Sequence, residues 1–193
     1  MRYTADHRAR TRARIVECAA RRFRQDGYAA AGIAEIMGDA GLTVGGFYAH
    51  FAGKEELFAE AITLAGAQAL ADRSPSPEPA PGAWVHAFVG NYLSAAHIDG
   101  RADGCPLAAL GADLARAGDA PRASYRDAAA CFADTLAAHL PGPAERRKST
   151  ARAVMAMCVG ALTLARAGLD EEAAGALFAS CGRAAADLVE ACR

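Results

Sequence analysis

Apolar residues recur at three- and four-residue spacing along most of the chain, which is the pattern of helices with one buried face. The first helix is expected over residues 7–25. Its apolar stripe consists of Ile15, Val16, Ala19, Ala20 and Phe23. Asp26-Gly27 ends this helix, because glycine commonly follows a helix C-terminus.

Two short helices are expected next, at residues 33–40 and 44–51, with a tight turn at Gly41-Leu42 between them. Thr43 can cap the second short helix with its hydroxyl. A helix, a short helix, a glycine turn and another short helix form the helix-turn-helix arrangement. In DNA-binding proteins the last of these is the recognition helix.

The rest of the chain also predicts helices. Residues 73–82 form the clearest linker, because prolines at alternating positions cannot continue a helix. A loop is expected at residues 98–104. The expected helices cover residues 54–72, 83–97, 105–118, 122–140, 144–167 and 170–192. The total is about nine helices, and the abundance of alanine, the best helix former, supports an all-α fold.

The recognition segment carries candidate DNA-binding chemistry. Phe47 and Phe51 lie four residues apart, so they share one face and can anchor the segment in a core. The other side chains then point elsewhere. An exposed Tyr48 and His50, followed by Lys54, form a plausible set of phosphate contacts.

The net charge of the 193 residues is only −1, but its distribution is uneven. Arginines crowd the N-terminus, where few acidic residues oppose them: Arg2, Arg8, Arg10, Arg12, Arg14, Arg21, Arg22 and Arg24. A basic leading arm indicates a polyanion partner at that end. The alternative interpretation is a solvated helix face.

The cysteines and the apolar runs point to a reducing compartment. The six cysteines form no CxxC pair and have no histidine at zinc spacing, so no metal site and no cofactor are expected. No signal peptide is recognisable, and no apolar run approaches the length of a membrane span. The sequence therefore predicts a cytoplasmic protein without membrane contact.

Three stretches together resemble the TetR family of bacterial transcriptional regulators. Residues 41–58 (GLTVGGFYAHFAGKEELF) carry the most specific part, and residues 15–28 and 33–37 match the family's first and second helices. Gly104-Cys105-Pro106-Leu107 also looks like a motif of some subgroups. The resemblance implies an all-α homodimer with a helix-turn-helix domain at residues 1–53 and a ligand-binding and dimerisation domain at residues 54–193.

The resemblance also assigns roles to residues. Thr43, Tyr48, His50 and Lys54 would contact DNA phosphates, and the bases would be approached by Val44, Gly45 and Gly46. The family usually has Ser or Thr before its second helix, where this chain has Ala31-Gly32, so one phosphate contact is expected to be missing or replaced by arginines of the first helix. Two recognition helices set by dimer symmetry would read a near-palindromic operator on double-stranded DNA. Repression, relieved by a small-molecule effector, is the family's usual mode.

The effector site is predicted from an aromatic stripe. Trp84, Phe88 and Tyr92 recur at four-residue spacing, and Tyr125, Met155 and Cys158 could complete an apolar pocket. Plain core packing is the competing interpretation of such a stripe. For the dimer interface we expect the last two helices, whose small residues include Gly160, Ala161, Ala174, Gly175 and Gly182. These alanines and glycines could instead ease packing within the chain.

Cys105 raises an alternative function. It precedes Pro106 at a helix start, where the helix dipole favours the reactive thiolate, so a redox- or electrophile-sensing repressor is conceivable. A metal sensor is disfavoured because His86 and His97 lie about three turns apart on one predicted helix. An enzyme is disfavoured because no nucleophile–base motif or glycine-rich phosphate loop is present. A helical interaction module without DNA binding would not explain Tyr48, His50 and Lys54 together.

Overall fold

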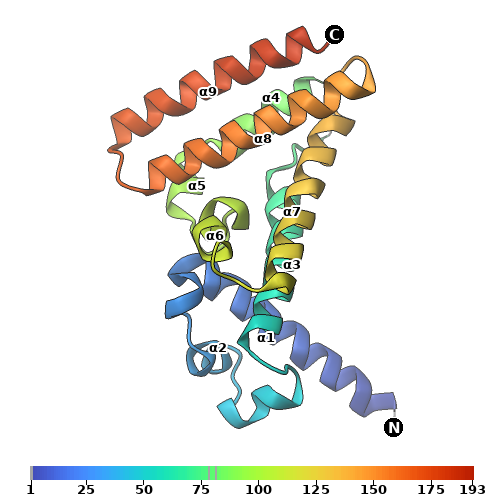
Figure 1. The fold of residues 1–193 in the computed structure, drawn as a ribbon, viewed down its shortest axis with the longest axis vertical. Coiled ribbons are helices and arrows are strands. Elements are labelled where there is room, and N and C mark those ends of the chain that lie inside the picture. The colour runs from blue at the N-terminus through green and yellow to red at the C-terminus, as the bar shows by residue number, and fades with distance from the viewer. Residues whose placement is uncertain (1, 78, 81) are drawn as a thin grey trace. The chain divides into compact units, whose positions relative to one another are not determined.

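The computed structural model describes residues 2–77, 79–80 and 82–193. This part of the chain is helical without strands, which confirms the predicted all-α fold (Figure 1). The elements are α1 (Arg2–Ala30), α2 (Ile33–Asp39), the 3-10 helix η1 (Val44–Ala49), α3 (Lys54–Arg73), α4 (Ala83–Tyr92), α5 (Ala95–Asp99), α6 (Pro106–Leu114), α7 (Asp119–Ala138), α8 (Ala144–Arg166) and α9 (Glu171–Ala191).

Helix ends follow local signals in the sequence. Gly27 interrupts α1 with φ of 80°, a left-handed conformation that glycine adopts without a steric penalty. Asp170 caps α9 by accepting a hydrogen bond from the Ala173 N–H at 2.8 Å. Pro106 stands in the first turn of α6, as predicted from its fixed φ.

The prediction of one helix over residues 83–97 is wrong. Leu93 leaves the helical region with φ of −90° and ψ of 72°, and a new helix, α5, begins at Ala95. The Ser94 side chain caps α5 by accepting from the His97 N–H. Serine competes for backbone donors in this way, so Ser94 was the missed signal. The predicted loop at residues 98–104 consequently starts later, after Asp99, and His86 and His97 occupy different helices.

The chain folds as two compact units. Unit 1 contains the residues up to Gln68 together with Ala102–Ala128, and its core is one apolar cluster built on α1, α2, η1 and α3. Helix α6 joins this unit by packing against α1. The first unit therefore includes more of the chain than the predicted DNA-binding domain of residues 1–53, and that functional boundary stays a prediction.

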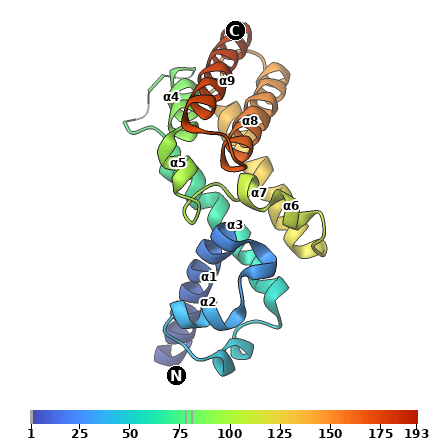
Figure 2. The ribbon, with the colours of Figure 1, turned by 90° about the vertical axis from the view of Figure 1, so that its left-hand side faces the viewer.

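Unit 2 contains Ala69–Arg101 and Ala129–Arg193. Helices α8 and α9 lie side by side in it, and α4 packs against α9 (Figure 1 and Figure 2). Its core includes Phe88, Leu136, Val154, Leu162 and Val189, all without solvent exposure. Across the described residues, no helix combines the length and the apolar character that crossing a bilayer requires.

Candidate nucleic-acid interface

The recognition segment is a 3-10 helix, not the α-helix expected from the sequence. Its two aromatic anchors behave as predicted: Phe47 and Phe51 are buried, and their rings stack with centroids 5.6 Å apart. The Thr43 side chain makes no capping hydrogen bond, so the predicted cap is wrong and its hydroxyl stays on the exposed surface. Gly45 and Gly46 have a low α-helix propensity, which is consistent with the tighter turns of a 3-10 helix here.

Burial of the two phenylalanines leaves the opposite side of η1 open. Tyr48 is 69% exposed and Val44 is 46% exposed, and both are large apolar side chains that a monomer core would ordinarily cover. An ideal Cβ built at Gly45 meets no atom within 4 Å. Tyr48 therefore does not complete the core, and the face formed by Thr43, Val44, Gly45 and Tyr48 is free to approach another surface.

Lys54 is more enclosed than predicted. Its ammonium donates to the Tyr28 carbonyl and lies 4.5 Å from the centroid of the Tyr28 ring. Burial lowers the pKa of Lys54, while the carboxylates of Glu35 and Asp113 act in the opposite direction. To contact a phosphate, the Lys54 ammonium would therefore have to give up its hydrogen bond to the Tyr28 carbonyl, or donate to the carbonyl and the phosphate at the same time.

Residues 102–128, which belong to unit 1, make hydrogen bonds with the N-terminal helices. Asp113 of α6 accepts from the Tyr28 N–H at 3.3 Å. Glu55, in the first turn of α3, accepts from the Gly118 N–H at 2.8 Å. These contacts join residues far apart in the sequence, so no local pattern could have predicted them.

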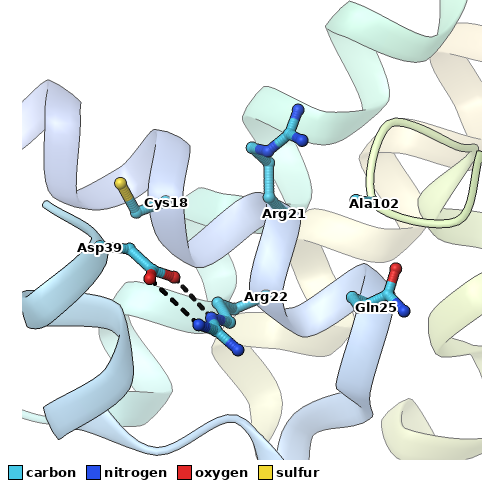
Figure 3. Close-up of a pocket in the computed structure, with 6 residues that line it drawn as sticks. All are labelled: Cys18, Arg21, Arg22, Gln25, Asp39 and Ala102. Atoms are coloured by element: carbon cyan, nitrogen blue, oxygen red, sulfur yellow. Dashed lines mark hydrogen bonds and ion pairs between the residues drawn. The ribbon is translucent and has the colours of Figure 1, made fainter.

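Arginines of α1 are mostly used to hold unit 1 together. Arg22 makes a bidentate ion pair with Asp39 of α2, beside a surface hollow of about 330 Å³ that Cys18 and Gln25 also line (Figure 3). The pair lowers the pKa of Asp39. Arg12 pairs with Glu56 and Glu60 of α3. The basic N-terminal arm is therefore less available to a polyanion than its composition indicated.

Arg24 is the clearest exception to the interpretation of the α1 arginines as a solvated helix face. It is only 4% exposed and donates to the carbonyls of Ala20 and Gly104 at 3.0 and 3.1 Å. A buried guanidinium needs such acceptors, because an unsatisfied buried charge is costly. Its role is to anchor the start of α6 on α1.

Residues 15–61 match the model of the bacterial regulatory proteins of the tetR family. The match covers α2, η1 and the first part of α3, together with the anchoring half of α1. This N-terminal part of the chain is therefore similar to the TetR family. Comparison with curated protein sequences finds no match.

Solved TetR-family structures share the fold over nearly the whole chain. A regulator from Cytophaga hutchinsonii is 20% identical with a TM-score of 0.77, covering 97% of this chain and 96% of that one. A regulator from Chloroflexus aurantiacus J-10-FL is 23% identical with a TM-score of 0.74, covering 96% of both. The reduced form of NemR from E. coli is 19% identical with a TM-score of 0.73, covering 89% and 94%. The chain therefore shares the fold of these solved structures.

The residues predicted for the TetR-type effector site divide between the two units. Cys105 and Tyr125 belong to unit 1, where the Tyr125 hydroxyl donates to the Leu107 carbonyl at 2.9 Å. Trp84, Phe88, Tyr92, Met155 and Cys158 belong to unit 2.

In unit 2 the aromatic stripe is tightly packed. Trp84 stacks on Phe88 at 5.1 Å and on His139 at 3.9 Å, and Phe88 and Tyr92 both lie near Phe132, at 5.4 and 5.6 Å. The rings thus form core contacts with one another. On the other face of α4, a hollow of about 360 Å³ is lined by His86, Val89, Gly90, Leu93, Phe178, Ala179 and Gly182.

Within residues 2–77, 79–80 and 82–193, no three His, Cys, Asp or Glu side chains gather closely enough to hold an ion.

Proposed function

We propose that this TetR-family protein is a ligand-responsive transcriptional regulator that binds duplex DNA as a homodimer. The observation that carries the proposal is the division of the recognition segment, residues 44–51, into a buried face with Phe47 and Phe51 and an exposed face with Tyr48 and Val44. Exposed aromatic and apolar side chains on a short, glycine-containing helix suit a contact surface more than a free one. The proposed role is that of a binding protein and not of an enzyme.

The residues have distinct proposed roles at the DNA. Thr43, Tyr48, His50 and Lys54 contact phosphates and fix the register, as backbone contacts generally do. Val44, Gly45 and Gly46 approach base edges, where the Val44 methyls can meet a thymine methyl. Because η1 lacks Arg, Asn and Gln, part of the sequence preference comes from DNA shape.

The dimer is proposed to form through α8 and α9. Gly160 and Gly175 are exposed, with open space where a Cβ would stand, and Leu164 is 57% exposed. These residues favour close approach of a partner helix. Ala161 and Ala174 are each only 3% exposed, so they serve packing within the chain instead. Two helices from each subunit would form a four-helix bundle and space the recognition segments for a near-palindromic operator.

A small-molecule effector is proposed to act on unit 2, by parting the packed stripe of Trp84, Phe88 and Tyr92 near Met155 and Cys158. A ligand that prefers the parted state shifts the population away from the DNA-binding state by that preference. Repression follows when the operator overlaps a promoter. The compartment proposed is the bacterial cytoplasm, where the operator lies and where thiols stay reduced.

The test is binding to the duplex upstream of the protein's own coding region, at about 50 and 200 mM salt. Wild type is compared with Tyr48→Ala and with Thr63→Ala, a control on the exposed face of α3. We expect wild type and control to bind in a salt-sensitive way and Tyr48→Ala to bind at least about tenfold more weakly, since a phosphate contact is lost. Equal binding by all three proteins would contradict the assignment of η1. If folded wild type does not bind, selection from random duplexes decides whether the operator lies elsewhere.

A thiol sensor acting through Cys105 is the second candidate. One observation favours it: Cys105 adjoins Gly104, whose carbonyl is bound by Arg24 of α1, so a modified Cys105 would strain the DNA-binding unit. Burial opposes it, because Cys105 is only 3% exposed whereas Cys131 is exposed. Access is required for thiol chemistry.

We expect iodoacetamide to alkylate Cys131 first and Cys105 more slowly than a free cysteine. Peptide mass spectrometry over a time course measures both rates in the same sample, with fully unfolded protein as the reference for free reactivity. Alkylation of Cys105 faster than in the unfolded reference would reverse this ranking and favour the sensor.

A further inference from the structure

A hollow of about 550 Å³ opens where the first turns of α1 meet the end of η1. Its lining comes from two elements of unit 1 and is rich in donors: His7, Arg8, Thr11, Tyr48, Ala49 and His50. Among the described residues, no acidic side chain lines it. From this cluster we infer that α1 and η1 jointly hold one phosphate of the DNA backbone, with Arg8 as its principal ligand. The inference rests on the proposed DNA binding and adds a contact outside the recognition segment.

Arg8 differs from the other α1 arginines in its partners. One of its N–H groups donates to the Ala49 carbonyl at 2.5 Å, which ties it to the last residue of η1. Ion pairs in the described part of the chain engage Arg10, Arg12, Arg21 and Arg22, but Arg8 has no carboxylate partner there. Guanidinium has five N–H donors and matches phosphate geometry, so Arg8 keeps capacity for an anion while held in place.

His50 contributes a second polar atom, a ring nitrogen that can donate to an anion in the tautomer that carries the proton there. Its Nδ1 atom is buried and finds no hydrogen-bond partner among the described residues. Burial, and then the positive charges of Arg8 and Arg12, lower the pKa of His50. The same field that disfavours a proton on His50 favours an anion in the hollow, because a negative charge there faces cations without a compensating carboxylate.

The start of α2 cannot supply an equivalent contact. Gly32 occupies its N-cap and offers no hydroxyl, and a Cβ at Gly32 would lie 2.0 Å from the Glu35 carboxylate. Glu35 therefore places negative charge at that helix start, where it repels a phosphate. The hollow on α1 offers the backbone contact that the α2 terminus lacks.

The expected occupant is a phosphodiester of the duplex that η1 contacts, since Tyr48 belongs both to the hollow and to the exposed recognition face. A free inorganic anion has the same chemistry. The two sources are separated by comparing a duplex with inorganic phosphate at equal ionic strength.

The experiment uses Arg8→Gln and, as a matched control, Arg14→Gln, which removes the same charge from another exposed position of α1. Binding to the operator duplex is measured over a range of salt. We expect Arg8→Gln to weaken binding about tenfold and to make the salt dependence less steep by about one per subunit, as for one lost phosphate contact. Arg14→Gln should change affinity less than Arg8→Gln. Equal effects of both variants on operator binding would overturn the inference while leaving the proposed function intact.

A second measurement does not require the operator. The imidazole ¹⁵N resonances of the five histidines are followed in full-length protein during titration at low salt with a random-sequence duplex and, separately, with inorganic phosphate. Shifts at His7 and His50, absent at His86 and reduced in Arg8→Gln, support the site. Shifts with the duplex alone assign it to DNA; equal shifts with inorganic phosphate would make it a general anion site and overturn the DNA assignment. Absence of any shift at His7 and His50 would overturn the inference.

Discussion

Phe58→Ala is expected to destabilise unit 1 by about 3–5 kcal/mol, the usual cost of removing a fully buried phenylalanine ring. Phe58 has no solvent exposure, and its ring lies 4.8 Å from that of Phe23 and 4.6 Å from that of Tyr28. Truncation would leave a cavity between α1 and α3, and Tyr28, whose carbonyl binds Lys54, would lose a neighbour. Urea unfolding followed by circular dichroism at fixed protein concentration measures the change.

Two controls bracket this effect. Phe58→Leu keeps most of the volume and should cost about 1–1.5 kcal/mol. Thr63→Ala, on the exposed face of the same helix, should change the free energy of unfolding by less than about 0.5 kcal/mol. A loss below about 1 kcal/mol for Phe58→Ala would mean that the aromatic cluster is not the centre of the unit's stability.

Stability is also expected to fall steeply in acid because of His97. This side chain is 3% exposed, and its pKa is lowered to about 3 by burial and then by the charge of Arg73, with Arg166 acting the same way. In the unfolded chain His97 has its ordinary pKa of 6.5. Between pH 6.5 and about pH 3, His97 is therefore protonated in the unfolded state and neutral in the folded state. Stability should fall by about 1.4 kcal/mol per pH unit across this window.

His97→Gln isolates the contribution, because glutamine does not titrate while the carboxylates and other histidines stay the same. Between pH 7 and pH 5 the wild type should lose about 2 kcal/mol more than the variant. The fluorescence of Trp84, the single tryptophan and a residue of the same unit, follows the unfolding. Parallel pH profiles for the two proteins would show that His97 takes up its proton in the folded state.

Much of this architecture could be predicted from local sequence. The spacing of Phe47 and Phe51 predicted their shared buried face, and Asp170 and Pro106 marked helix starts that the structure confirms. Capping, glycine conformation and apolar periodicity act over a few residues, so they can be identified from the sequence without knowledge of the fold. The residues of the recognition motif belong to this local class, which is why a short stretch is enough to carry the resemblance to the TetR family.

The partners of the charged residues could not be predicted in this way. Composition presented the α1 arginines as one basic arm, yet Arg12 meets Glu60, Arg22 meets Asp39, and Arg24 is buried against the Gly104 carbonyl. The acceptors come from other helices, and a charge is neutralised only where folding brings its partner within a few ångströms. Arg8, by contrast, has no carboxylate partner within the described part of the chain and lies beside η1. No local pattern contains this difference between neighbouring arginines.

The sequence by itself determined the helices, the anchored recognition segment and the resemblance to the TetR family, because those follow from periodicity and short motifs. Only the tertiary structure decided that the Lys54 ammonium binds the Tyr28 carbonyl and that residues 102–128 make hydrogen bonds with the N-terminal helices. It also decided that the stripe of Trp84, Phe88 and Tyr92 is a packed core. Each of these depends on contacts between distant residues. Such contacts arise from long-range packing, and local propensity does not encode them.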